Sequence, residues 1–321
     1  MLRAERLAPK DYAAYLAEVE LINKLKHPHV LRFIGVCWSQ PNAVLVTEWM
    51  AGGSLFDLLH AHRDTDGEDP PQPRPLPLLR TLRYGEQIAS AVAYVHARGV
   101  VHRDIKSSNI LLDRERSTCK IADFGLSRHL ATHGKSMTVE TGTLRWMAPE
   151  LLTGNGKYGT AVDVYSFGVV MWELLSGQMP YPLLSPVEAA VRVVRDNLRP
   201  AMPDGVPAEL AAAVVACWGA DAATRPAAGD MEESLRKWRT AAEEAAAPDG
   251  DAATTPLSEH KRNPSDTQML RSLSSAILAQ QEDEVDSVPG VVVVPHTPLR
   301  KPGLLASIRG MLCCKQPGGS Q

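Results

Sequence analysis

The spacing of apolar residues along the chain predicts three long helices. Residues 12–26 carry one apolar stripe that stops at Pro28, and residues 79–98 carry another that closes at Gly99. Residues 162–175 are apolar almost all round, which is typical of a helix buried in the centre of a domain. Shorter helices are predicted over 187–195, 208–218 and 230–238.

Two short runs predict strands. Residues 30–37 and 43–49 are rich in apolar and β-branched side chains, and a turn around Pro41 separates them. We therefore expect an antiparallel hairpin. At the start of the central helix, Thr160 and Asp163 have the spacing of a capping pair.

Two segments lack any sustained period. Residues 60–77 combine acidic side chains with five prolines, which predicts an extended loop. A solvated spacer is favoured there over an SH3 ligand, although Pro70 and Pro73 form a P-x-x-P pair. From residue 241 onward the chain is rich in Ala, Ser, Thr, Pro and acid and has no aromatic side chain, so 241–321 is expected to be mostly disordered.

Composition narrows the class of protein. The 321 residues are 44% hydrophobic, enough for a globular core, and the net charge of -3 gives no basic field for nucleic acid. We therefore expect no nucleic-acid partner. The charged start lacks a signal peptide, no apolar run spans a membrane, and the five cysteines have neither metal nor disulfide spacing. These features predict a cytoplasmic protein.

Polar motifs follow the second long helix. The run His102-Arg103-Asp104-Ile105-Lys106-Ser107-Ser108-Asn109 precedes Asp123-Phe124-Gly125 by fourteen residues, counted from Asn109 to Asp123, and Ala148-Pro149-Glu150 follows. In this order the motifs resemble those of eukaryotic protein kinases. The resemblance covers about residues 1–240. It implies a two-lobed α+β kinase fold with a mostly helical large lobe and an incomplete small lobe.

The resemblance also implies roles in moving the ATP γ-phosphate to a protein hydroxyl. Asp104 is expected to accept the hydroxyl proton, and Lys106 to offset charge on the transferred group. Asn109 and Asp123 offer the oxygen ligands that Mg²⁺ prefers. A surface ion pair is the simpler interpretation of any one of these residues, but not of the ordered set.

An ATP site is implied near the start of the chain. Glu18 takes the position of the family's helix glutamate, and Thr47 the position that closes the back of the adenine pocket. Glu48 and Met50 belong to the hinge, whose backbone reads adenine. Asp57 is placed to contact the ribose hydroxyls.

The wording of the motifs indicates the substrate class. The combination of Lys106 and Thr143 resembles that of Ser/Thr kinases, in which the threonine hydrogen-bonds to the catalytic base and to the lysine. Neighbouring sequence motifs resemble those of tyrosine kinases instead. This mixture matches the tyrosine-kinase-like group, which implies serine or threonine acceptors in protein substrates. Arg103 is expected to receive an activation-loop phosphate, with Thr138 and Thr141 among the candidate phosphosites.

Other matching residues resemble the family's scaffold. Glu150 and Arg225 are expected to form a buried pair, and Asp163 to hold the backbone of the catalytic loop.

Two family elements are absent from the sequence. No glycine-rich loop and no strand lysine precede Glu18, and Arg3 stands fifteen residues before it. We therefore expect the first three strands of the small lobe to be missing, leaving a two-stranded hairpin and one helix. Either the sequence starts inside a longer reading frame, or the protein is a remnant. The alternative function is a catalytically weak or inactive kinase-like scaffold or binding module.

These features divide the chain into a partial small lobe (1–50), a large lobe (51–240) and a tail (241–321). The last part of the tail, residues 289–321, is basic and contains no acid, with a short apolar stretch beside Cys313 and Cys314. We hypothesise that both cysteines are palmitoylated and give reversible, peripheral membrane attachment. An ordinary disordered terminus is the simpler alternative.

Overall fold

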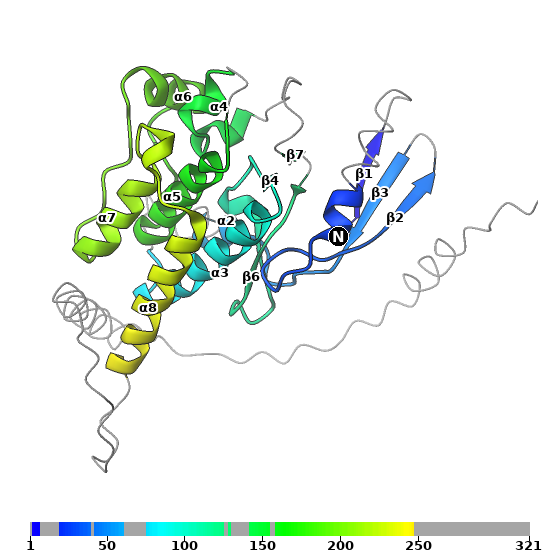
Figure 1. Cartoon of the computed structure of the whole chain (residues 1–321), viewed down its shortest axis with the longest axis horizontal. Coiled ribbons are helices and arrows are strands. Elements are labelled where there is room, and N and C mark those ends of the chain that lie inside the picture. Colours follow the sequence, from blue (N-terminus) through cyan, green and yellow to red (C-terminus); the bar gives the residue numbers. More distant parts are fainter. Residues whose placement is uncertain are drawn as a thin grey trace, which may run out of the picture.

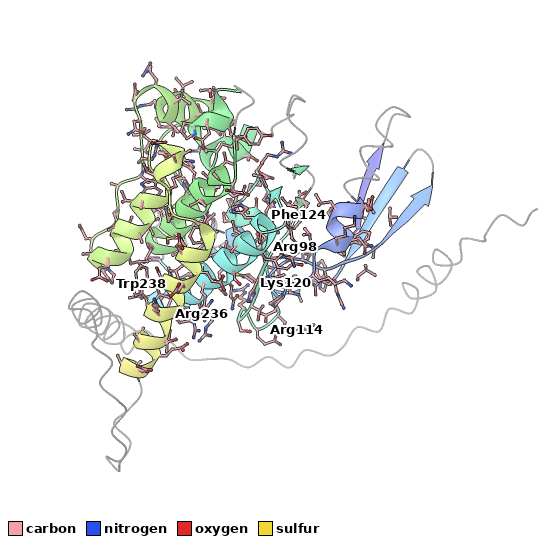
Figure 2. All side chains as sticks on the ribbon, in the orientation of Figure 1. Arg98, Arg114, Lys120, Phe124, Arg236 and Trp238 are labelled. Carbon is pink, nitrogen blue, oxygen red and sulfur yellow. The ribbon has the colours of Figure 1, made fainter. Side chains whose placement is uncertain are left out.

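The structure is a computed structural model. It describes residues 2–6, 19–39, 42–60, 75–124, 128–129, 141–154 and 158–246. A small three-stranded sheet lies on one side of the molecule and a larger helical part on the other (Figure 1). Figure 2 shows Lys120 and Phe124 on the side of the helical part nearest to the sheet. The expected α+β organisation is confirmed.

The sheet contains one strand more than the sequence predicts. Its strands are β1 (Leu2–Arg6), β2 (Phe33–Ser39) and β3 (Asn42–Thr47), in the order β1-β3-β2. Strands β2 and β3 form the predicted antiparallel hairpin. The expectation that the hairpin stands alone is wrong, because β1 pairs antiparallel with β3 along its whole length. Five residues are too short a pattern to reveal a strand before its partner is known.

The segment that leads into the sheet is attached to the helical part. Of the first predicted helix, residues 19–26 are described, and 19–24 of them are helical. Behind it, the N–H of Leu31 donates to the carbonyl of Ile121 (2.9 Å), and the N–H of Ile121 donates to the carbonyl of His29 (2.9 Å). Ile121 ends β6 (Cys119–Ile121), which pairs with β5 (Ile110–Leu112).

Both ends of the predicted proline-rich loop belong to ordered structure. His60 is not a loop residue but the last residue of α2 (Leu55–His60), and it is buried. At the other end, the N–H of Leu76 donates to the carbonyl of Leu174 (3.2 Å). Residues 61–74 lie outside the described residues. The predicted loop starts too early because His60 has a polar side chain, which suggested a loop. In the structure this side chain is buried and has a hydrogen-bond partner, described below.

The second predicted helix is α3 (Leu78–His96), and its apolar face is buried as expected. Gly99 has a φ of 69°, the left-handed conformation that glycine adopts without a steric penalty, so the predicted stop is confirmed. After it, β4 (Val100–Val101) pairs with β7 (Arg128–His129), and the 3₁₀ turn η3 (Ser107–Asn109) follows β4.

The predicted central helix is α5 (Ala161–Ser176), and every residue from Val162 to Ser176 is buried. The predicted capping pair is wrong. Thr160 makes no side-chain capping bond, because its backbone is itself helical (φ −61°, ψ −23°), and the Asp163 carboxylate is turned toward residues 102 and 103.

The remaining helices are α4 (Pro149–Leu152), α6 (Pro186–Arg195), α7 (Ala208–Cys217) and α8 (Ala228–Ala246), with 3₁₀ turns η5 (Thr141–Arg145) and η6 (Ala222–Thr224). Of these helices, α7 packs on α5, α8 packs along α3, and α6 packs on α4 and the turn η5. Helix α8 continues past residue 240, so the predicted boundary of the tail falls six residues too early. Arg239 joins α8 to Glu86 of α3 at 2.6 Å. Residues 247–321 lie outside the described residues.

Within the described ranges, none of the helices is both long and apolar enough to cross a lipid bilayer.

One close contact between α5 and α7 predicts a mutational effect. A Cβ atom at Gly168 would stand 2.7 Å from the Cβ of Cys217, far closer than ordinary van der Waals contact. We expect Gly168→Ala to lower the free energy of unfolding by about 1–3 kcal/mol, the usual cost of overpacking a core. Urea denaturation followed by circular dichroism measures it.

The same substitution at Gly229 is the control. A Cβ there meets nothing within 4 Å, and the residue lies in α8. Gly229→Ala should leave stability unchanged or raise it by up to about 1 kcal/mol. Equal destabilisation by both variants would contradict the packing explanation.

Candidate active site

The backbone of the catalytic loop, defined as residues 102–109, is held by one buried carboxylate. Asp163 Oδ2 accepts from the N–H of His102 (2.8 Å), and Oδ1 accepts from the N–H of Arg103 (2.7 Å). Nε2 of His96 contacts Oδ2 at 2.8 Å. Arg103 has a φ of 67°, unusual for a residue with a side chain, and the two bonds to Asp163 hold that conformation. The expected role of Asp163 is thereby observed.

The partners of Asp163 also fix its charge. Burial by itself would raise the pKa of this carboxyl, but the hydrogen bond and charge of His96, together with the N–H of Arg103, lower the pKa overall. The group therefore stays ionised across the neutral range. An ionised acceptor makes stronger bonds to backbone N–H groups than a neutral one.

His102 is neutral and has one defined tautomer. Its Nδ1 accepts from the N–H of Asp104 (3.2 Å), whereas Nε2 lies 3.1 Å from the carbonyl of Ala122, which can only accept. The proton is therefore on Nε2. Burial lowers the pKa of His102, and its ring packs edge-on against Phe124 with centroids 4.6 Å apart. His102 thus joins the catalytic loop to the Asp123-Phe124 segment.

Asp104, Lys106 and Asn109 lie together, as the resemblance implies. Asp104 Oδ2 accepts from Asn109 Nδ2 at 2.7 Å and lies 3.1 Å from Lys106 Nζ. Asn109 Nδ2 also donates to the Asp104 carbonyl at 2.9 Å. The other carboxylate oxygen, Oδ1, is buried and has no hydrogen-bond partner among the described residues. One oxygen is thus oriented by two donors, and the second is left to accept a proton.

Thr143 completes this cluster from a different part of the chain. It lies in η5, is buried, and accepts from Lys106 Nζ at 2.7 Å. The expected contact between threonine and lysine is observed. Lys106 is therefore placed between the carboxylate of Asp104 and the hydroxyl of Thr143.

Asp123 is presented to solvent by an unusual backbone conformation. Its φ is 62° and its side chain is exposed, while the flanking residues Ala122 and Phe124 are buried. The N–H of Ala122 donates to the carbonyl of Asn109 (2.8 Å). This bond holds the two predicted metal ligands, Asn109 and Asp123, on neighbouring stretches of backbone. A non-glycine residue held at positive φ is strained, and such strain is concentrated at functional sites.

The donor set suits magnesium. Asn109 spends its NH₂ group on Asp104, and its Oδ1 makes no hydrogen bond to the rest of the described chain. An amide oxygen and a carboxylate are oxygen donors, which Mg²⁺ prefers, and it usually keeps water and phosphate as further ligands. The described ranges hold no group of three or more His, Cys, Asp or Glu arranged to bind a metal, so no all-protein metal cage is found there.

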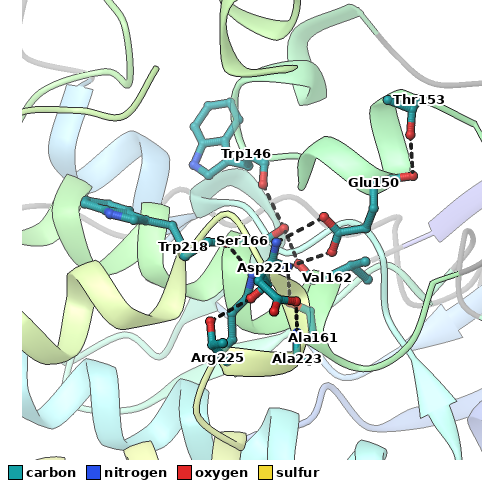
Figure 3. Close-up of polar contacts among 12 residues, drawn as sticks. Trp146, Glu150, Thr153, Ala161, Val162, Ser166, Trp218, Asp221, Ala223 and Arg225 are labelled. Carbon is teal, nitrogen blue, oxygen red and sulfur yellow. Dashed lines mark hydrogen bonds and ion pairs between the residues drawn. The ribbon is translucent and has the colours of Figure 1, made fainter. Parts of the chain in front are cut away.

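The expected pair of Glu150 and Arg225 is present, but only the arginine is buried, since the Glu150 side chain is 23% exposed. Arg225 donates from both terminal nitrogens to the Glu150 carboxylate, at 2.6 and 3.0 Å, and also to the carbonyl of Ala161 (Figure 3). Figure 3 also shows Ser166 donating to the carbonyl of Trp146, at 2.8 Å. These bonds tie the segment after η5 to the start of α5 and to η6.

Several residues of the predicted hinge make side-chain contacts or are buried. Thr47 donates to the carbonyl of Glu48 (3.2 Å), and Met50 is buried. The Glu48 carboxylate accepts from the N–H of Arg32 and from Lys120 Nζ, each at 2.7 Å. Burial would raise the pKa of Glu48, but Lys120 and Arg32 lower it overall. The side chain is thus used structurally, as is the N–H of Glu48, which donates to the carbonyl of Arg32 (3.0 Å).

Asp57 has a structural partner. Its carboxylate accepts from the N–H and hydroxyl of Ser54, at 3.0 and 2.7 Å, and the Ser54 hydroxyl accepts from the N–H of Asp57. This reciprocal arrangement caps the start of α2. The predicted contact with ribose stays a prediction.

The regulatory residues are only partly described. Arg103 is buried and donates to the Tyr158 hydroxyl (3.0 Å). Thr141 begins η5. Glu18 and Thr138 lie outside the described residues, as do Cys313 and Cys314.

Sequence reasoning missed several polar partners. His96 was not connected with Asp163, nor Lys120 with Glu48, because both contacts join residues more than sixty positions apart. Glu173 was also passed over. Its signal was available, since a carboxylate inside an otherwise apolar helix must have partners when buried.

The fold is that of a protein kinase catalytic core: a small sheet, a larger helical part, and the polar cluster of Asp104, Lys106, Asn109 and Thr143. A comparison with protein families agrees: the profile of the protein tyrosine and serine/threonine kinases matches residues 2–235. The chain belongs to that family.

Relatives of the chain are named as kinases of serine and threonine. It is 36% identical over 237 residues to the serine/threonine-protein kinase STY17 of Arabidopsis thaliana, covering 74% of this chain and 39% of that protein. It is 36% identical to the serine/threonine/tyrosine-protein kinase HT1 of Arabidopsis thaliana, covering 70% and 54%. It is 34% identical to the serine/threonine-protein kinase TNNI3K of Rattus norvegicus, covering 71% and 26%. The chain therefore spans well under two thirds of the length of these relatives.

The neutral His102 predicts a pH dependence of stability. Its pKa is lower in the folded protein than in the unfolded chain, so the unfolded state binds more protons as the pH falls below about 6.5. The free energy of unfolding should therefore fall between pH 7 and pH 5, by up to about 1.4 kcal/mol per pH unit for this one group. Urea denaturation at a series of pH values measures it.

His102→Gln is the matched variant, since it removes the titrating ring but keeps a polar side chain. It should lower stability at pH 7 and flatten the dependence on pH. His27 and His29, whose pKa values burial also lowers, leave a residual slope in both proteins. Parallel curves for the two proteins would show that His102 does not contribute.

Proposed function

We propose that the chain transfers the γ-phosphate of ATP to serine or threonine hydroxyls of protein substrates. The observation that carries this proposal is the set of contacts made by the two oxygens of the Asp104 carboxylate. Asn109 and Lys106 orient its Oδ2, and its Oδ1 is buried without a partner among the described residues. An oriented carboxylate with one unused oxygen is suited to take the proton from an attacking hydroxyl.

The remaining residues of the cluster fit the charges of the reaction. Magnesium-bound ATP supplies the phosphoryl group and neutralises part of its charge. Asn109 Oδ1 and the Asp123 carboxylate would hold the magnesium ion, and the Lys106 ammonium would face the oxygens on which charge develops. The hinge around Glu48 and Met50, with Thr47 behind it, would receive the adenine.

Serine and threonine are favoured as acceptors by the contact between Lys106 and Thr143. The lysine is anchored at 2.7 Å to Thr143 and lies 3.1 Å from the base, so it occupies the space beside the attacking oxygen. The names of the relatives point the same way, although that of HT1 also includes tyrosine. A tyrosine acceptor is therefore included in the test.

Activity is tested with Asp104→Asn. Asparagine keeps the shape of the side chain but cannot hold the transferred proton. We expect phosphate transfer from labelled ATP to mixed Ser/Thr-containing peptides to fall by about 10²- to 10⁴-fold. The same substitution at the exposed Asp196, which bonds Arg195 on the surface, should leave the rate unchanged.

The alternative, a scaffold without catalysis, gives a different result. In that case the unmodified chain shows no transfer above the Asp104→Asn background, although its helical part is folded by circular dichroism. Transfer confined to tyrosine peptides would instead correct the substrate class.

A cytoplasmic location and the absence of a nucleic-acid partner are part of the proposal, supported by the composition and the near-neutral net charge. Attachment to membranes through Cys313 and Cys314 stays a prediction.

A further inference from the structure

The buried carboxylate of Glu173 is not used by the chemistry described so far. It lies near the end of α5 and its side chain has 0% exposure. A charged group that is removed from water is costly unless donors surround it. Its partners therefore show what the residue is for.

Three donors from three separate segments converge on Glu173. Oε1 accepts from the hydroxyl of Ser107 and contacts Nε2 of His60, both at 2.7 Å, and Oε2 accepts from Nε1 of Trp146 at 3.1 Å. Ser107 belongs to the catalytic loop, Trp146 follows η5, and His60 ends α2. One carboxylate thus holds three elements that are far apart in the sequence.

Two of these donors stand beside the contact between Lys106 and Thr143. Ser107 is the next residue after Lys106 and opens η3, in which the N–H of Asn109 donates to the carbonyl of Lys106 (2.9 Å). On the other side, the N–H of Trp146 donates to the carbonyl of Thr143 (3.1 Å). Fixing both side chains on one carboxylate therefore fixes the separation between the backbones that carry Lys106 and Thr143.

His60 contributes the third arm with a defined proton. Its Nε2 faces the carboxylate, and its buried Nδ1 has no partner in the described part of the chain. A proton on Nε2 and a lone pair on Nδ1 avoid an unsatisfied buried donor. His60 thus acts as a donor that links α2, the helix after the hinge, to Glu173.

We propose that Glu173 is a positioning residue for phosphoryl transfer. Its carboxylate holds Ser107 and Trp146 together and so keeps Lys106 and Thr143 in the register that places the lysine beside the base. The proposal deepens the proposed function and rests on it for the kinetic effect. The holding of the two segments is measurable without catalysis.

The central experiment is Glu173→Gln in the full chain. Glutamine has the same shape, but its NH₂ group replaces one acceptor oxygen, so at least one of the three donors loses its partner. Hydrogen–deuterium exchange with mass spectrometry should show about tenfold faster exchange in peptides covering 106–112, in peptides covering 142–148, or in both, according to which oxygen the NH₂ group replaces. Unchanged exchange in both segments overturns the proposal.

A matched control separates positioning from a general loss of stability. Tyr84 is fully buried, and its hydroxyl donates to the carbonyl of Arg116 (2.5 Å), away from the catalytic loop. Tyr84→Phe removes one buried hydrogen bond without touching the network. It should leave exchange in 142–148 unchanged. Equal acceleration there by Tyr84→Phe overturns the proposal.

Single-arm variants keep the test decisive if Glu173→Gln does not fold. Ser107→Ala and Trp146→Phe each remove one donor and leave the carboxylate in place. Each should accelerate exchange in its own segment, and the two effects on stability should be non-additive in a double-mutant cycle, because they share one acceptor. Additive effects overturn the proposal.

Kinetics give the last readout. Where the unmodified chain phosphorylates a Ser/Thr peptide, Glu173→Gln should lower kcat by about ten- to a hundredfold and leave the KM for ATP within about twofold, since misplacement acts on the reacting geometry. An unchanged kcat per folded molecule overturns the positioning role. An unmodified chain without activity defeats the proposed function, and the exchange results still decide whether Glu173 holds the two segments.

Discussion

The site depends on the bond between a buried carboxylate and two backbone N–H groups. Asp163 reaches His102 and Arg103 from the centre of the domain, where little water competes for the interaction. Because those N–H groups face Asp163, the chain turns through a positive φ at Arg103 and presents Asp104 at the other side of the loop. Without that anchor, the orientation of Asp104 by Lys106 and Asn109 would have no fixed frame.

The anchor is one of a series of polar positions on α5. Asp163, Ser166 and Glu173 are spaced by three and seven residues, so they lie along one side of a helix whose remaining buried side chains are almost all apolar. Asp163 holds the start of the catalytic loop, Ser166 the carbonyl of Trp146, and Glu173 the middle of the loop. The buried helix α5 thereby sets the relative positions of segments that are themselves irregular.

The sequence predicted what depends on local pattern or on an ordered motif. Helices α3 and α5 and the hairpin of β2 and β3 were predictable because periodicity encodes them, and the cluster of Asp104 with Asn109 was implied by the family resemblance of the motifs. What it could not supply were facts that exist only after folding. Strand β1 becomes a strand by pairing with β3, and His60 becomes a helix residue by meeting Glu173.

The bonds between residues 29–31 and β6 affect how the two parts of the molecule can move. These residues directly precede the hairpin of β2 and β3 in the sequence, yet they are joined through Ile121 to the helical part. A rotation of the sheet relative to the helices would therefore leave 29–31 behind. Its pivots would fall at Arg32 and at Glu48, which already share a hydrogen bond. The hairpin of β2 and β3 would thus turn about two neighbouring, hydrogen-bonded points of the chain, one at each of its ends.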